Sequence, residues 1–206
     1  MIHQLSAILK ATLDKGGFVP LRLTETMVTR LEQEAPQDYG IDGTERRIIR
    51  PSNSDVQTFF YSGKAHCHTL KNVIVAGLED RQIKGLSGTY EGKKHDKKVC
   101  DEEQTCLPKG RDLYRDTGFQ GQEMEGVNIH QPTKKKRGVE LTQEEKEGNR
   151  LISRVRVVIE HVISGVKRCR IVKDIFRNTK AGYDDEVIEL ACALHNFRSY
   201  NRRMAY

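Results

Sequence analysis

The sequence predicts an α/β fold in which a mixed sheet is flanked by helices. Three strand-length apolar segments, at residues 39–50, 68–78 and 81–90, follow one another through short polar connections, as in an antiparallel meander. A long segment at residues 150–170 then repeats its apolar residues at a helical period. Such a helix has one apolar face, which we expect to pack against the sheet.

The N-terminal residues predict a small helical appendage. Residues 3–15 and 22–34 each carry apolar residues at helical spacing, and a Lys15-Gly16-Gly17 turn separates the two segments. This part of the chain is too short to bury a core of its own. We therefore expect three regions, namely the appendage, a main domain and a short tail, at residues 1–38, 39–200 and 201–206.

The first strand segment contains Asp42-Gly43, which has two interpretations. Asp-Gly is a strong hairpin-turn signal, so local chemistry favours Asp42 in a turn. The alternative places Asp42 within a strand, where its carboxylate projects from the sheet into a cleft. The sequence by itself leaves both interpretations open.

The next segments predict the centre of the sheet. Residues 68–78 form a near-continuous apolar run, which is typical of a strand buried on both faces. Glu79-Asp80 turns the chain into the strand at 81–90. Residues 51–57 are polar and predict a loop, whereas residues 91–103 predict a polar helix or loop with Asp96 near its N-terminus.

A weaker strand at residues 108–121 leads into Asp116-Thr117-Gly118. The Asp116 carboxylate could cap the turn that follows, or it could serve chemistry at the end of the strand. A further short strand is expected at residues 127–130. Thr142 and Glu145 then have the spacing of a capping box that starts the long helix.

The long helix carries one acid among basic residues. Glu160 lies one helical turn after Arg156 and one turn before Ser164, and the other charged residues of segment 150–170 are all Lys or Arg. Glu160 could form a surface ion pair with Arg156, worth about 0.3–0.5 kcal/mol. It could instead be a metal ligand on a helix that also faces phosphates. A last amphipathic helix is expected at residues 183–200.

The positive charge is concentrated in one stretch. The chain has a formal net charge of +6, yet residues 133–180 alone contain 14 Lys and Arg against six acids, an excess of eight. A localised basic stretch suggests a polyanionic partner, although a solvated helix face gives the same composition. The run Lys134-Lys135-Lys136-Arg137 could neutralise phosphates in the same way.

The cysteines and the apolar runs exclude several classes of protein. Five cysteines without a Cys-x-x-Cys pair predict reduced, mostly buried thiols and no disulfide framework. An irregular zinc site and hence a zinc-binding structural module remain a minor alternative, with His66, Cys67, His68, His95, Cys100 and Cys106 as its candidate ligands. No apolar run approaches a membrane span, and no secretory signal is evident. We therefore expect a cytoplasmic or nucleoid protein without a membrane partner.

Several motifs of this sequence, in order, resemble one family. They are IDGTERRI, YSGK with HTLKN, HDKK, LYRDTGFQG, RVRVVIEHVISGVKR and ACALHNFR, spread over almost the whole chain. Together they resemble the DDE-superfamily endonuclease domain of insertion-sequence transposases, in the PIF/Harbinger-like group. The resemblance implies an RNase H-like fold and a catalytic Asp-Asp-Glu triad.

Carried over to this sequence, the triad is Asp42, Asp116 and Glu160. Three carboxylates from distant segments can hold two Mg²⁺ ions, with Mn²⁺ as a substitute, on either side of a scissile phosphate. His95 and Asp96 match the family's His-Asp pair, for which we expect a role in positioning the ligands or the DNA. Basic residues expected to contact DNA are Lys134, Lys135, Lys136, Arg137, Arg156, Lys167 and Arg168.

The resemblance implies a transposase that hydrolyses a DNA phosphodiester and transfers the freed 3′ end to a target. Relatives usually carry an N-terminal helix-turn-helix segment before this domain, so a separate reader product and a homo-oligomer on DNA are expected partners. The alternative is a catalytically idle remnant that binds DNA and competes with an intact transposase for the element's ends.

Overall fold

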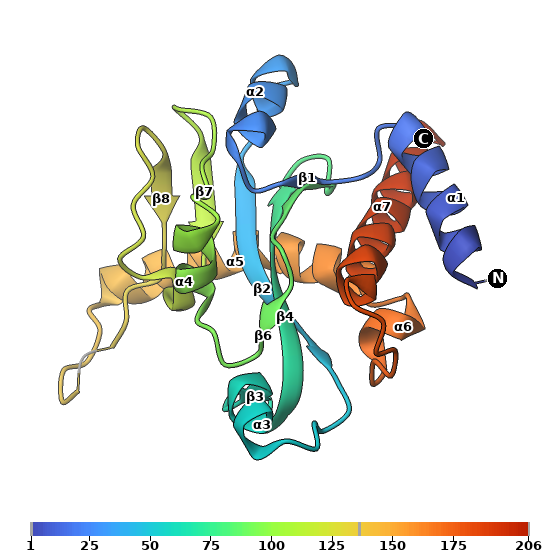
Figure 1. The fold of residues 1–206 in the computed structure, drawn as a ribbon. Helices are drawn as coiled ribbons and strands as arrows, with labels where there is room; N and C mark the ends of the chain where they lie inside the picture. Colours follow the sequence, from blue (N-terminus) through green and yellow to red (C-terminus); the bar gives the residue numbers. More distant parts are fainter. Residues whose placement is uncertain (1, 136, 206) are drawn as a thin grey trace.

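The structure is a computed structural model that describes residues 2–135 and 137–205. A mixed eight-stranded sheet forms its centre, with the strand order β1-β5-β4-β2-β7-β8 and with β3 and β6 paired to β4 (Figure 1). The strands are β1 (Leu21–Arg22), β2 (Tyr39–Arg47), β3 (Tyr61–Ser62), β4 (Cys67–Gly77), β5 (Ile83–Leu86), β6 (Tyr90–Glu91), β7 (Asp112–Arg115) and β8 (Asn128–His130).

The middle of the sheet is the predicted meander. β2 and β4 pair in antiparallel fashion without interruption, from Tyr39 opposite Gly77 to Arg47 opposite Thr69, and β5 pairs antiparallel with β4. β7 then runs parallel to β2, and β8 runs parallel to β7. The prediction of an α/β fold with a mixed sheet is therefore confirmed, and the arrangement is consistent with an RNase H-like fold.

Two hydrophobic cores lie on opposite faces of the sheet. Successive side chains of a strand point to opposite faces, so Ile74 and Ala76 of β4 pack in one core and Val73 and Val75 in the other. The helices that cover the first face are α5 (Gln143–Val166), α6 (Arg170–Lys173) and α7 (Tyr183–Met204), and those over the second are α2 (Glu25–Gln33) and α4 (Asp96–Glu102). In Figure 1, α5 runs behind the strands and crosses them.

The long helix begins as predicted and ends earlier. The Thr142 hydroxyl accepts the N–H of Glu145 and the Glu145 carboxylate accepts the N–H of Thr142, so the capping box is present. Helix α5 ends at Val166, because Cys169 adopts an extended conformation and starts the separate helix α6. The last helix is longer than predicted, since α7 continues to Met204 and residues 201–204 are helical.

The N-terminal segment contributes to the sheet as well as covering it. Helix α1 (Ile2–Lys15) lies alongside α7 (Figure 1), and β1 pairs in parallel with β5. The Arg22 guanidinium donates to the carbonyl of Ser87, at 3.0 Å, and pairs with the Asp185 carboxylate of α7. The predicted helix at 22–34 is confirmed in part, because Arg22 belongs to β1 and α2 begins only at Glu25.

One predicted loop is a helix. Residues 54–60 form α3 (Ser54–Phe60), and the Asn53 side chain accepts the N–H groups of Asp55 and Val56. Asparagine is a preferred N-cap, and its capping hydrogen bonds satisfy donors that the first helical turn leaves open. The loop prediction for residues 51–57 was therefore wrong for its second half.

Two glycines of α5 provide a matched test of how α5 packs on α7. A Cβ at Gly165 would lie 2.3 Å from Nδ1 of His195 in α7, whereas one at Gly148 would have no atom within 4 Å. We expect Gly165→Ala to lower the free energy of unfolding by about 1–3 kcal/mol through overpacking. Gly148→Ala should raise it by about 0.5–1 kcal/mol, the usual helix preference for alanine. Denaturant unfolding measures both, and equal gains in the two variants would contradict this packing.

Candidate active site

Asp42 lies within strand β2 and not in a turn. The β2–β4 pairing runs through it, with Asp42 opposite Ile74, so the hairpin interpretation of Asp42-Gly43 is wrong. Directly opposed residues of paired strands share a face of the sheet, and Ile74 packs in the core beneath α5. The Asp42 side chain therefore projects toward the α5 face. Its Oδ1 accepts the N–H of Gly43 at 2.8 Å.

Asp116 follows strand β7 directly beside Asp42. The parallel pairing of β2 with β7 ends at Ile41 opposite Arg115. Asp42 and Asp116 are the residues that directly follow this last pair. Neighbouring strands lie about 4.8 Å apart. The Asp116 carboxylate also accepts the N–H of Thr117 at 2.6 Å and caps the short 3₁₀ helix η1 (Thr117–Phe119). The capping role that the sequence suggested is therefore present.

One guanidinium group of α5 lies between these two acids. Nη2 of Arg156 is 3.6 Å from Oδ2 of Asp42, and its Nη1 is 3.7 Å from Oδ1 of Asp116. Both carboxylates therefore face the same position, which the Arg156 guanidinium occupies. The pKa of Asp42 is raised, mainly by burial, and the nearby Arg156 and the Gly43 N–H offset this only in part.

Glu160 lies on the same helix and is exposed to solvent. It follows Arg156 by one helical turn, so both residues lie on one side of α5. Within the described chain no ion pair involves Glu160, so the predicted surface pair with Arg156 is not formed. Asp42 and Asp116 are thus adjacent, whereas Glu160 contacts neither and lies one helical turn along α5 from Arg156, which contacts both.

The two carboxylates are the type of ligand that a hard divalent cation prefers, and the position they share holds the Arg156 guanidinium. Mg²⁺ is usually bound by one or two carboxylates together with water and substrate phosphate, and Asp42 and Asp116 offer two that face one point. The Asp116 side chain is 40% exposed, which leaves room for water and a phosphate. In residues 2–135 and 137–205 no three His, Cys, Asp or Glu side chains are close enough to form a complete ligand set. The same result removes the irregular zinc site as an assembled cluster in that part of the chain.

The His-Asp pair lies at the start of α4, on the opposite face of the sheet. A Cβ at Gly43 would lie 2.7 Å from Oδ1 of Asp96, so only the absence of a side chain there allows the Asp96 carboxylate to approach. Nζ of Lys71, in β4, is 3.1 Å from the same oxygen. Asp96 is therefore held behind the backbone next to Asp42, while His95 is exposed. No local pattern indicated a role for Lys71, which belongs to the buried run of β4.

The residues that the sequence predicts to contact DNA lie in separate places. Lys134, Lys135 and Arg137 line a surface depression of about 560 Å³ that also includes Gln120, directly after η1. Lys136 lies outside the described residues. Arg156 lies between the aspartates, and Lys167 is half-buried with its pKa lowered by burial. Arg168 is exposed and lines a separate cavity between α5 and α7.

Comparison with known proteins decides the family. The sequence model of the DDE superfamily endonuclease family matches residues 41–196, which includes Asp42, Asp116 and Glu160. The chain belongs to this family. DDE superfamily endonucleases generally use divalent metal ions, which agrees with the carboxylate donors described above.

One curated relative is a probable transposase. Over 142 residues the DDE chain is 36% identical to a probable transposase for insertion sequence element IS702 from Microchaete diplosiphon, a match that covers 67% of this chain. The matched part is 49% of that relative, so the chain spans about half its length. No solved structure matches the chain. Among the described residues, none of the helices combines the length and the apolar character needed to cross a bilayer.

Proposed function

We propose that this DDE chain is the catalytic domain of a transposase, which cuts a DNA phosphodiester and joins the freed 3′ end to a target strand. The observation that carries the proposal is the adjacency of Asp42, within β2, and Asp116, directly after β7, where both carboxylates face one cation. Glu160, on the helix that covers this point, is proposed as the third acid.

The residues have distinct roles in this proposal. Asp42 and Asp116 hold the metal ions from the sheet, and Glu160 completes the set from α5 when DNA and metal are bound. Two Mg²⁺ ions, or Mn²⁺ in their place, supply an activated attacking oxygen and stabilise the leaving oxygen. Arg156 then has an anionic phosphate as an alternative partner for its guanidinium. Asp96, held by Lys71 behind Gly43, positions the β2 backbone next to Asp42.

The DNA backbone is proposed to lie across the basic residues around these acids. Lys134, Lys135 and Arg137 lie on the Asp116 side of the site, and Arg156, Lys167 and Arg168 follow α5. Lys136 is proposed to contact DNA with them. Such contacts position DNA without reading its sequence. Recognition of the element's ends is therefore assigned to a separate reader segment or product, and pairing of two ends to a homo-oligomer.

The proposal is tested with the purified chain and DNA that carries an element end. In Mg²⁺ or Mn²⁺ we expect nicking at the end and joining of the 3′-hydroxyl to a second duplex, and chelation by EDTA should abolish both. Gel analysis of end-labelled strands measures them. Should a longer transposase with the same domain nick this DNA while the present chain does not, the isolated chain is not a working transposase.

A second candidate function is a DNA-binding remnant without catalysis. It is favoured by the position of Arg156 between Asp42 and Asp116 and by the lack of contact between Glu160 and either residue. DNA binding that weakens steeply with salt, without any metal-dependent cleavage, would support this alternative.

A further inference from the structure

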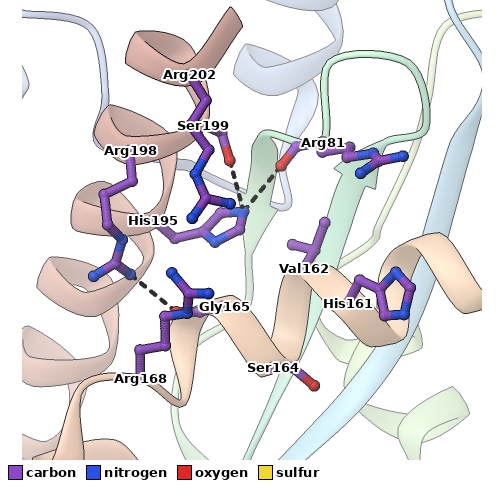
Figure 2. A pocket seen from close by; sticks show the side chains of 10 residues that line it. All are labelled: Arg81, His161, Val162, Ser164, Gly165, Arg168, His195, Arg198, Ser199 and Arg202. Carbon is purple, nitrogen blue, oxygen red and sulfur yellow. Dashed lines mark hydrogen bonds between the residues drawn. The ribbon is translucent and has the colours of Figure 1, made fainter.

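A basic cavity of about 360 Å³ lies between α5, α7 and the turn from β4 to β5 (Figure 2). Neither Asp42 nor Asp116 lines it. Its charged side chains come from segments far apart in the sequence, and no carboxylate lines it. The lining residues are Arg81, His161, Val162, Ser164, Gly165, Arg168, His195, Arg198, Ser199 and Arg202.

Helix α7 supplies one wall as a continuous stripe. His195, Arg198, Ser199 and Arg202 are spaced three and four residues apart, so they share one face of the helix. Arg168 comes from the turn that follows α5. Its positive charge and that of Arg202 both act on the His195 ring, which lies on the same wall of the cavity (Figure 2).

The charge of this cavity is not neutralised by the protein. Within the described chain, none of the guanidinium groups of Arg81, Arg168, Arg198 and Arg202 forms an ion pair with a carboxylate. Like charges one helical turn apart, as at Arg198 and Arg202, repel one another. Closely spaced arginines without counter-ions match the planar, multiply hydrogen-bonding recognition of phosphate.

The cavity is built from fixed groups and is not a loose set of surface cations. The imidazole Nε2 of His195 lies 3.0 Å from the carbonyl oxygen of Arg81 and 3.3 Å from Oγ of Ser199. Nη2 of Arg198 donates to the carbonyl of Gly165 at 2.9 Å. The absence of a side chain at Gly165 lets the His195 ring approach α5. Burial and the neighbouring arginines lower the pKa of His195, so its ring is favoured in the neutral form.

The cavity adjoins the part of α5 that carries Glu160. Ser164, on its wall, follows Glu160 by one helical turn, a rise of about 6 Å along the axis. We propose that this cavity binds a phosphate of the DNA backbone further along α5 from the proposed scissile phosphate, with Arg168 and Arg202 as its main contacts. This inference rests on the proposed function and adds a backbone contact, Arg202, that the sequence did not indicate.

The test compares pocket variants with a matched control on the same helix. Arg168→Gln and Arg202→Gln each remove one charge from the cavity, and Arg203→Gln removes one from the exposed residue next to Arg202, which does not line it. Binding of a random-sequence duplex is measured in EDTA at several salt concentrations, so that no cleavage is needed. Arg198 stays unchanged because it also holds the Gly165 carbonyl.

We expect each pocket variant to reduce the slope of log affinity against log salt by about 0.9, the value for one lost phosphate contact. At about 100 mM salt the affinity should fall several-fold in these variants, and Arg203→Gln should change both quantities clearly less. Equal changes in all three variants would show general electrostatic attraction and overturn the proposal. A wild-type chain that does not bind DNA would overturn it as well.

Two further outcomes separate this inference from the proposed function and from a free anion. If wild type nicks DNA in Mg²⁺ and the pocket variants bind and nick as Arg203→Gln does, the pocket proposal fails and the proposed function stands. If the salt slopes change as expected and no cleavage occurs, the pocket proposal stands and the proposed function fails. Should inorganic phosphate, at constant ionic strength, stabilise wild type but not Arg202→Gln while DNA affinity is unchanged, the cavity binds a small anion and the DNA proposal is wrong.

Discussion

Asp116→Asn will lower metal-dependent nicking by about a thousandfold or more if Asp116 is a metal ligand. A bound metal ion stabilises the transition state by several kcal/mol, and about 4 kcal/mol corresponds to a factor of a thousand in rate. Asparagine is as good an N-cap as aspartate, so the hydrogen bond to the N–H of Thr117 can persist. The variant therefore removes the charge while keeping the turn. Single-turnover nicking of an end-containing duplex in Mg²⁺ measures the loss.

Asp112→Asn is the matched control for this experiment. Asp112 is the first residue of β7, four residues before Asp116. Its side chain accepts a hydrogen bond from Asn128, at 2.9 Å, and lies 3.2 Å from the His130 ring. We expect its nicking rate to stay close to that of wild type. An Asp116→Asn variant as active as Asp112→Asn would remove Asp116 from the proposed triad.

Arg46→Ala will lower the free energy of unfolding by about 3–5 kcal/mol, because each buried acceptor left without a partner costs about 1–3 kcal/mol. The Arg46 side chain is fully buried in β2. Its guanidinium donates to Oδ1 of Asn72 at 2.9 Å, to the carbonyl of Asp184 at 2.9 Å and to Oγ1 of Thr89 at 3.2 Å. These contacts join β2, β4 and the start of α7, so their loss leaves several buried polar groups unpaired.

The neighbouring arginine provides the control. Arg47 is the next residue of β2, and its side chain is exposed. Arg47→Ala removes the same chemical group and should change the unfolding free energy by no more than about 0.5 kcal/mol. Urea unfolding followed by circular dichroism compares the two variants. A loss below about 1 kcal/mol in Arg46→Ala would mean that the buried network contributes little.

The sequence predicts those parts of the fold whose signals are local and strong. The apolar run of β4, the helical period of α5 and the capping box at Thr142 and Glu145 each depend on neighbouring residues, and each is confirmed. Asp42-Gly43 shows the opposite case. Its local turn signal is overridden because the backbone of β2 is paired along its length with β4.

The missed features depend on contacts between distant segments. β1 contains only Leu21 and Arg22, and its place in the sheet is set by β5, some sixty residues later. Nothing in the sequence distinguishes the buried Arg46 from the exposed Arg47. The cavity arginines are at positions 81, 168, 198 and 202, so no window of the sequence brings them together. The N-cap at Asn53, in contrast, was a local signal that could have predicted α3.

The triad residues could be predicted from their motifs, but their arrangement in space could not be predicted. The end of the β2–β7 register, which makes Asp42 and Asp116 neighbours, is a property of the paired strands. The position of Arg156 between them follows from how α5 crosses the sheet. Their proposed roles therefore rest on the experiments above and not on proximity alone.

The continuity of α5 has a mechanical consequence. One uninterrupted helix carries Glu160, Ser164 and Gly165. The spacing between Glu160 and the basic cavity therefore cannot change unless the hydrogen-bonded backbone of α5 bends. A nucleic-acid strand that engages both places must adopt this fixed spacing. DNA that must bend to meet this spacing would bind more weakly where its base sequence makes it stiff, even though α5 contacts no base.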